Sequence, residues 1–163
     1  LRAVNQIVEE GFASPILVGN PDKIKRVSRE KGLDNIENVK IIDHLEDPKA
    51  EVYAKTMFDL RHRRGVMFPE AKHLMRDSNF FAAMAVHLGD ADAMITGSDS
   101  KYADAVKPIL QVIGPGQRKT AAGLNIVLIQ DKMLFFADTS VNINPNAQQV
   151  ANTAIYASQV AEY

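Results

Sequence analysis

The sequence contains no cysteine among its 163 residues. It therefore forms neither a disulfide nor a thiolate zinc site, which is typical of a reducing compartment and predicts a cytoplasmic protein. It has no apolar run near the roughly 20 residues that a membrane-spanning helix needs, and no recognisable signal peptide. The formal net charge is only -1, with 19 basic and 20 acidic side chains, which argues against nucleic acid or a membrane surface as partner.

What is present is typical of a globular protein, with 46% hydrophobic and 24% charged residues. The length suits one domain with a proper core or part of a larger protein. Leu1 already stands in helical phase without a capping residue before it, and an apolar helical stripe from Ala147 runs up to Tyr163 without a glycine or proline stop. We therefore expect a fragment of a longer polypeptide.

Short apolar runs bounded by Gly, Pro and Asp alternate with amphipathic stretches along the chain. The runs predict strands at 15–19, 39–43, 92–97, 124–129 and 133–138, and the stretches predict helices at 20–32, 48–64, 69–77, 79–89 and 101–113. This alternation predicts an α/β fold of three layers, α/β/α, with a mainly parallel sheet that includes residues 15–18, 39–42 and 92–96 and has helices on both faces. The last two runs flank "QDK", a plausible tight connection between paired strands.

The stretch "IGPGQRKT" (113–120) combines a Gly-Pro-Gly turn with two cations, at the point where the pattern changes from helices to paired strands. It fits a domain boundary and an ordinary surface loop equally well. The resulting domain assignment is 1–117 and 118–163.

Three stretches are candidates for binding chemistry, and each has a plain structural alternative. In "LRHRRG" (60–65), Arg61 and Arg64 are three residues apart and fit a phosphate clamp, but cations also complement the dipole at a helix C-terminus. In "TGSDSKYADAVKP" (96–108), Gly97 permits a close backbone approach to an anion, but a capped strand-to-helix turn explains the same residues.

The third stretch, "FFADTSVNINPNAQQVANTAI" (135–155), runs from an apolar strand through small polar residues, among them Asp138 and Asn142, into a helix. Such strand ends hold ligands in open α/β folds, and they are also where turns occur. The chain has no G-x-G-x-x-G fingerprint, so any nicotinamide site of a parent protein lies outside it. The one E-x-x-H pair, Glu70 and His73, is no metal site by itself, and we expect none.

Taken in order, these stretches resemble the phosphate acetyltransferase/phosphate butyryltransferase family along nearly the whole chain. The matching motifs are "ASPILVG", "LRHRRG" (family L-R-x-x-K-G), "GDADAMITG" (family G-x-A-D-G-x-x-S-G), "ADAVKPILQVIGPG" and the long stretch at 135–155. The resemblance implies a two-lobed fold like that of isocitrate and isopropylmalate dehydrogenases, with most of the first lobe in 1–117 and the start of the second in 118–163. It also implies an interdomain loop in which Asn144 and Pro145 start the last helix.

The departures from the family pattern concern the predicted ligand loop. Where the family has S-G-A-x-H-S/T-T, the chain has Ser100 at the His position and Tyr102 at the final Thr. The resemblance implies two arginines that bind the coenzyme A phosphates. One is kept as Arg61, and the other is replaced by Lys107, which keeps the charge but lacks the bidentate fork. The family's catalytic Ser-Arg pair and nearby Asp fall beyond Tyr163, so no catalytic residue is predicted here.

"HRRGV" together with Tyr102 is more similar to one subgroup, the phosphotransacetylase-like C-terminal domain of large bacterial NADP-dependent malic enzymes. This resemblance implies a domain that binds acetyl-CoA as an inhibitor and supports a homo-oligomer, while NADP and a divalent metal belong to the parent's other domain. One alternative is a phosphate acetyltransferase that moves acetyl between coenzyme A and phosphate, and another is an assembly module with a vestigial cleft. The predicted acetyl-CoA-binding residues are Arg61, Arg64, Gly97, Tyr102, Lys107, Asp138 and Asn142.

Overall fold

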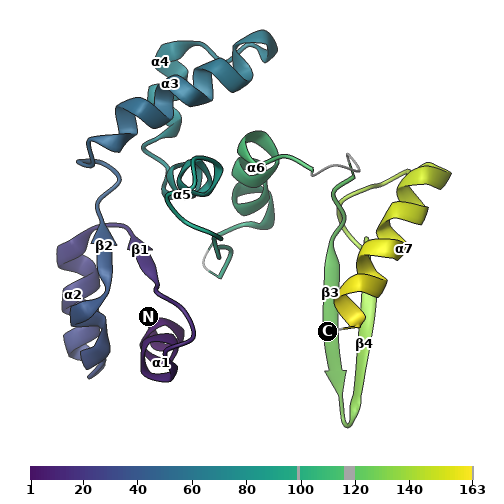
Figure 1. The fold of residues 1–163 in the computed structure, drawn as a ribbon, viewed down its shortest axis with the longest axis horizontal. Coiled ribbons are helices and arrows are strands. Elements are labelled where there is room, and N and C mark those ends of the chain that lie inside the picture. The colour runs from purple at the N-terminus through teal and green to yellow at the C-terminus, as the bar shows by residue number, and fades with distance from the viewer. Residues whose placement is uncertain (99, 116–119, 163) are drawn as a thin grey trace. The chain divides into compact units, whose positions relative to one another are not determined.

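The computed structural model describes residues 1–98, 100–115 and 120–162, which separate into two compact units, 1–113 and 114–163 (Figure 1). In the first unit the elements are α1 (Arg2–Glu10), β1 (Ile16–Val18), α2 (Pro21–Glu30), the 3₁₀ helix η1 (Asp34–Asn38), β2 (Lys40–Ile42), α3 (Lys49–Arg61), the 3₁₀ helix η2 (His62–Arg64), α4 (Phe68–Leu74), α5 (Ser78–His87) and α6 (Tyr102–Val112). In the second unit they are β3 (Leu124–Ile129), β4 (Lys132–Ala137) and α7 (Ala147–Ala161). The domain boundary expected between residues 117 and 118 lies outside the described residues.

The two short apolar runs near the N-terminus form a parallel pair, β1 and β2, with Leu17 opposite Ile41. The connection between them is α2, which starts where the sequence predicts: the Asn20 side chain accepts a hydrogen bond from Lys23 N at 2.9 Å, and Pro21 occupies the first turn. A parallel pair joined through a helix is the α/β pattern, so the predicted fold class is confirmed.

The prediction of a third strand in this sheet, at residues 92–96, is wrong. The segment has no regular secondary structure. The Ile95 side chain is 95% exposed, Met94 packs on the helical core, and Thr96 Oγ1 donates a hydrogen bond to Asn79 Oδ1 at 2.6 Å. A strand requires a partner ladder, and this segment is held by side-chain contacts to a helix in its place.

The hydrophobic core of the first unit lies between helices α3, α4, α5 and α6. Phe81 on α5 is at its centre, only 1% exposed, with the Tyr53 ring 4.8 Å away between centroids. Helix α5 is apolar nearly all round, and its burial is as the sequence predicts. The buried cluster comprises Tyr53, Ala54, Met57, Ala71, Met75, Phe80, Phe81, Ala83, Met84 and Val112.

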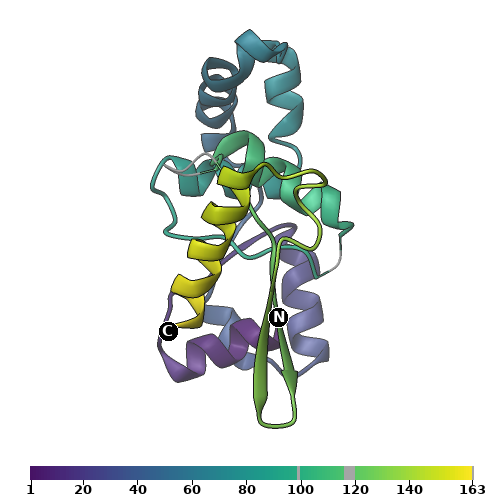
Figure 2. The same ribbon diagram turned by 90° about the vertical axis from the view of Figure 1, so that its right-hand side faces the viewer.

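The second unit is a β-hairpin with a helix packed against it (Figure 2). Strands β3 and β4 pair antiparallel from Leu124 opposite Ala137 to Ile129 opposite Lys132, as "QDK" predicts, and Gln130 adopts φ 52 in the tight turn. Helix α7 lies along β4.

The prediction that this last helix starts at Asn144 and Pro145 is wrong. The N-cap of α7 is Asn146, whose side chain accepts from Gln149 N at 2.9 Å while Gln149 Oε1 accepts from Asn146 N at 2.9 Å. This reciprocal capping box satisfies two backbone donors at once, which explains why the helix begins after it.

Within the described ranges, no helix has both the length and the apolarity needed to cross a membrane.

Candidate functional site

The basic turn at the end of α3 holds one arginine in an unusual environment. Arg61 is the last residue of α3 and is half-buried, and its Nε is buried without a hydrogen-bond partner among the described residues. A buried guanidinium N–H without an acceptor costs free energy, on the order of 1–3 kcal/mol or more for a charged group. An acceptor supplied by a ligand would remove that cost.

The local sequence explains how this turn forms. Helix α3 tightens into the 3₁₀ turn η2, and Gly65 ends it with φ 95, a conformation that side-chain-bearing residues rarely adopt. His62 folds back on α3, where its Nδ1–H donates to Phe58 O at 3.1 Å, and Arg63 and Arg64 are exposed. Because these cations lie at a helix C-terminus, the dipole accounts for part of their placement.

The second candidate region is the loop that leads into α6. Gly97 has φ 104, and a Cβ built on it would lie 3.8 Å from Ala105 Cβ, so the loop passes close to α6. Tyr102 is the first residue of α6 and is 55% exposed. Ala105, Pro108 and Val112 form the buried stripe of this helix, and Lys107 is exposed. The loop and the first two turns of α6 thus present a glycine backbone, a phenol and a cation.

Asp138 and Asn142 contact each other in the second unit. Asp138, with φ 55, accepts from Asn142 Nδ2 at 2.8 Å and from Asn142 N at 3.2 Å, and Asn142 Nδ2 also donates to Ala121 O at 2.8 Å. The side-chain hydrogen bond from Asn142 holds the pKa of the Asp138 carboxyl below its ordinary value, and backbone N–H groups lower it further. The pair closes the loop after β4, so the polar residues of this stretch form the turn itself.

Replacing Asp138 with asparagine is expected to lower the free energy of unfolding at neutral pH. A carboxyl whose pKa is lower in the folded state stabilises that state above its unfolded pKa, and the contribution is lost as the pH falls through the folded pKa. The difference between wild type and Asp138→Asn should therefore shrink below about pH 4. Urea denaturation at several pH values measures it, with Asp131→Asn in the β3–β4 turn as control. A difference that does not change with pH would contradict this role.

A pocket that sequence reasoning did not find lies within the second unit, between the start of β3 and α7. Its volume is about 460 Å³, and small residues dominate its lining. Thr153 lines it and has a buried Oγ1 without a hydrogen-bond partner in the described part of the chain. Neither Asp138 nor Asn142 lines it. Only a non-local arrangement reveals such a pocket, and no motif marks it.

The predicted residues thus fall into three groups: Arg61 and Arg64 at the end of α3, Gly97, Tyr102 and Lys107 at the start of α6, and Asp138 with Asn142 in the second unit. Among the residues that the structure describes, Arg61, Arg64 and Lys107 form no ion pair, and no group of three or more metal-ligating side chains is present. As far as the described residues show, these three cations are not neutralised by ion pairs, and with Gly97 they suit a phosphorylated ligand. That all seven residues share one site stays a prediction.

Comparisons with known proteins agree with the family resemblance of the sequence. The family described as phosphate acetyl/butaryl transferase matches residues 1–163. Phosphate acetyltransferase from Clostridium acetobutylicum is 34% identical over 169 residues, covering 99% of this chain and 50% of the relative. A probable NADP-dependent malic enzyme from Rickettsia prowazekii is 27% identical over 164 residues, covering 99% of this chain and 21% of that protein.

The fold has a counterpart among solved structures. A phosphotransacetylase from Streptococcus pyogenes superposes with a TM-score of 0.85 at 26% identity, covering 94% of this chain and 47% of that one. The chain thus spans about half the length of several of the proteins that it resembles.

Proposed function

We propose that this chain, which belongs to the phosphate acetyl/butaryl transferase family, binds an acyl-CoA thioester at the end of α3 and the start of α6. The observation that carries the proposal is the buried, unpartnered Nε of Arg61. A phosphate oxygen of coenzyme A would accept from the guanidinium of Arg61 in a charge-assisted hydrogen bond.

The neighbouring groups fit the rest of such a ligand. Arg64 is exposed and adds positive charge near the same turn, while Lys107 on α6 supplies a point charge for a second phosphate. Gly97, with φ 104, gives the loop a backbone conformation that side-chain-bearing residues rarely adopt.

We further propose that the bound acyl-CoA regulates a malic enzyme. The supporting feature is Tyr102, a large and exposed side chain where the family's pattern has a small hydroxyl residue. A phenol there crowds the place of inorganic phosphate and still offers a ring face to the thioester. The parent protein would be a homo-oligomer, with NADP and a divalent metal in its oxidoreductase domain.

Phosphate acetyltransferase activity is the second candidate. It is favoured by two relatives named phosphate acetyltransferase, which are 30% and 34% identical to this chain and cover 99% of it. A full-length protein that converts acetyl-CoA and phosphate into acetyl phosphate, and does not oxidise malate, would establish this function in place of the first. By contrast, residues 1–163 alone should not turn over acetyl phosphate, because the family's catalytic positions fall outside them.

Tyr102→Ala is expected to weaken inhibition of malate oxidation by acetyl-CoA and to leave basal malate turnover near normal. An effector shifts a remote active site only through contacts that differ between two states of the protein, and Tyr102 is proposed to make one of them. The experiment titrates malate-dependent NADP reduction with acetyl-CoA in the full-length protein. Tyr102→Phe, which keeps the ring, serves as the matched control, and identical inhibition curves for wild type and Tyr102→Ala would remove Tyr102 from the site.

A further inference from the structure

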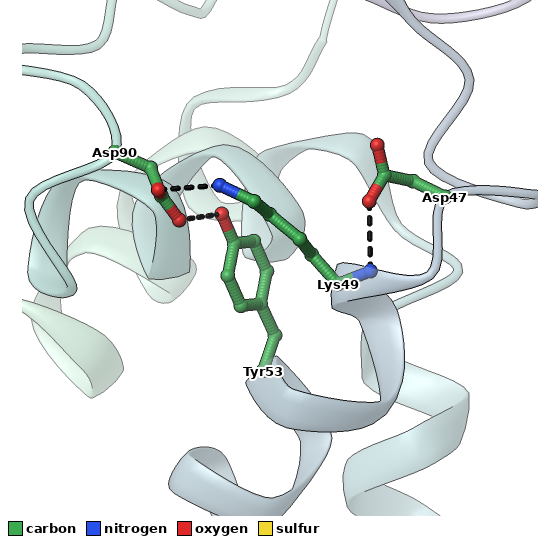
Figure 3. A network of polar contacts seen from close by, with 4 residues as sticks. All are labelled: Asp47, Lys49, Tyr53 and Asp90. Carbon is green, nitrogen blue, oxygen red and sulfur yellow. Dashed lines mark hydrogen bonds and ion pairs between the residues drawn. The ribbon is translucent and has the colours of Figure 1, made fainter.

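A cluster of three polar side chains ties the end of α5 to the start of α3. The Tyr53 hydroxyl donates to Asp90 Oδ2 at 2.5 Å, and Lys49 Nζ forms an ion pair with Asp90 Oδ1. Figure 3 shows Lys49 and Tyr53 on α3 with both side chains directed at the Asp90 carboxylate. The backbone of Lys49 is itself fixed, because Lys49 N donates to Asp47 Oδ1 at 2.8 Å.

The cluster is joined to the hydrophobic core through Tyr53. Tyr53 is 2% exposed and packs against Phe81, so only its hydroxyl reaches the polar surface. Burial first, and then the hydrogen bond to Asp90, raise the pKa of Tyr53, whereas the hydrogen bonds from Lys49 and Tyr53 hold the pKa of Asp90 below its ordinary value. Both groups thus keep the protonation states that the contact needs at neutral pH.

The chain that follows Asp90 is tied to α5 at a second point. Asp90 N donates to Ala85 O at 2.8 Å near the end of α5, and Thr96 Oγ1 donates to Asn79 Oδ1 at 2.6 Å near its start. The segment 90–96 therefore returns along α5 and is fixed at both ends. The residue after the second anchor is Gly97, where the proposed ligand loop begins.

We infer that Asp90 and Thr96 are positioning residues, which set the place of Gly97 and Ser98 for acyl-CoA binding without contacting the ligand. The inference rests on the proposed function. Thr96 is the nearer anchor and is followed at once by the loop. Asp90, held by Tyr53 and Lys49, fixes the start of the segment. A loop with its base fixed in the free protein loses less conformational entropy on binding, so loss of an anchor should weaken binding.

The test uses Thr96→Val in the full-length protein, because valine keeps the shape of threonine and removes the hydroxyl that donates to Asn79. We expect acetyl-CoA affinity by calorimetry to fall about three- to tenfold, the size of one ordinary hydrogen bond. We also expect amide hydrogen exchange to rise in peptides that cover 97–101 in the absence of ligand. Thr96→Ser keeps the hydroxyl and should restore both.

Two further variants separate positioning from general stability. Thr56→Val removes a hydroxyl that donates to Val52 O within α3, and it should change neither affinity nor exchange at 97–101. Tyr53→Phe keeps the packed ring and removes the O–H to Asp90, so exchange should rise in peptides that cover 90–96 and affinity should fall.

The outcomes are distinguishable. Wild-type affinity in Thr96→Val, or raised exchange without a change in affinity, would overturn the inference and leave the proposed function intact. If the wild type does not bind acetyl-CoA, the proposed function fails. Amide hydrogen exchange then tests the anchoring by itself. Unchanged exchange at 97–101 in Thr96→Val would overturn the inferred anchoring, and raised exchange would support it.

Discussion

Replacing Arg61 with alanine in the full-length protein is expected to weaken acetyl-CoA binding about ten- to a hundredfold, corresponding to about 1.5–3 kcal/mol for a charged hydrogen bond. The Nε of Arg61 is already buried without a partner in the described structure. The free protein therefore carries a desolvated donor, which a ligand phosphate would satisfy. Isothermal calorimetry of wild type and variant measures the change.

Two matched variants sharpen this test. Arg63→Ala removes an exposed cation from the same turn and should reduce affinity only slightly, since exposed charges are screened by solvent and salt. Arg61→Lys keeps the charge without the planar fork, so its acetyl-CoA affinity should lie between those of wild type and Arg61→Ala. Unchanged affinity in Arg61→Ala would exclude the residue from the site, and "LRHRRG" would then be a helix end stabilised by its dipole.

Phe81→Ala is expected to destabilise the first unit by about 3–5 kcal/mol, the usual cost of removing a buried phenylalanine from a packed core. Phe81 is 1% exposed and contacts the rings of Tyr53 and His44, at centroid separations of 4.8 and 6.2 Å. The cavity would remove the support of the Tyr53 ring, so loss of stability should be accompanied by loss of the Tyr53–Asp90 hydrogen bond. Urea denaturation followed by circular dichroism measures the free energy of unfolding.

Phe12→Ala is the control for Phe81→Ala, since it makes the same chemical change at a side chain that is 69% exposed. It should change the free energy of unfolding by no more than about 0.5 kcal/mol. Similar losses in both variants would mean that the core does not lie where α3, α4, α5 and α6 meet.

Features fixed by neighbouring residues could be predicted from the sequence. The start of α2 at Asn20 and Pro21, the β3–β4 pairing around Gln130 and the burial of α5 depend on local caps, turns and periodicity. The family resemblance is also confirmed. It rests on short motifs, each of which is made of neighbouring residues and can be read from the sequence.

Features that depend on distant contacts could not be predicted. The apolar run at 92–96 has the composition of a strand, but its last residue, Thr96, is held by a hydrogen bond to Asn79 on another element. The Arg61 side chain is ordinary in sequence, and only packing shows that its Nε is buried. The same holds for Tyr53 and Asp90, which are 37 residues apart.

The anchored segment 90–96 also has a consequence for how such a domain diverges in evolution. Its two anchors use side chains on α3 and α5, whereas Ser100 and Tyr102, two of the positions that depart from the family pattern, lie beyond the second anchor. Substitutions beyond a fixed base touch few packed groups and so cost little folding free energy. Substitutions at this loop therefore leave a folded protein on which selection can act.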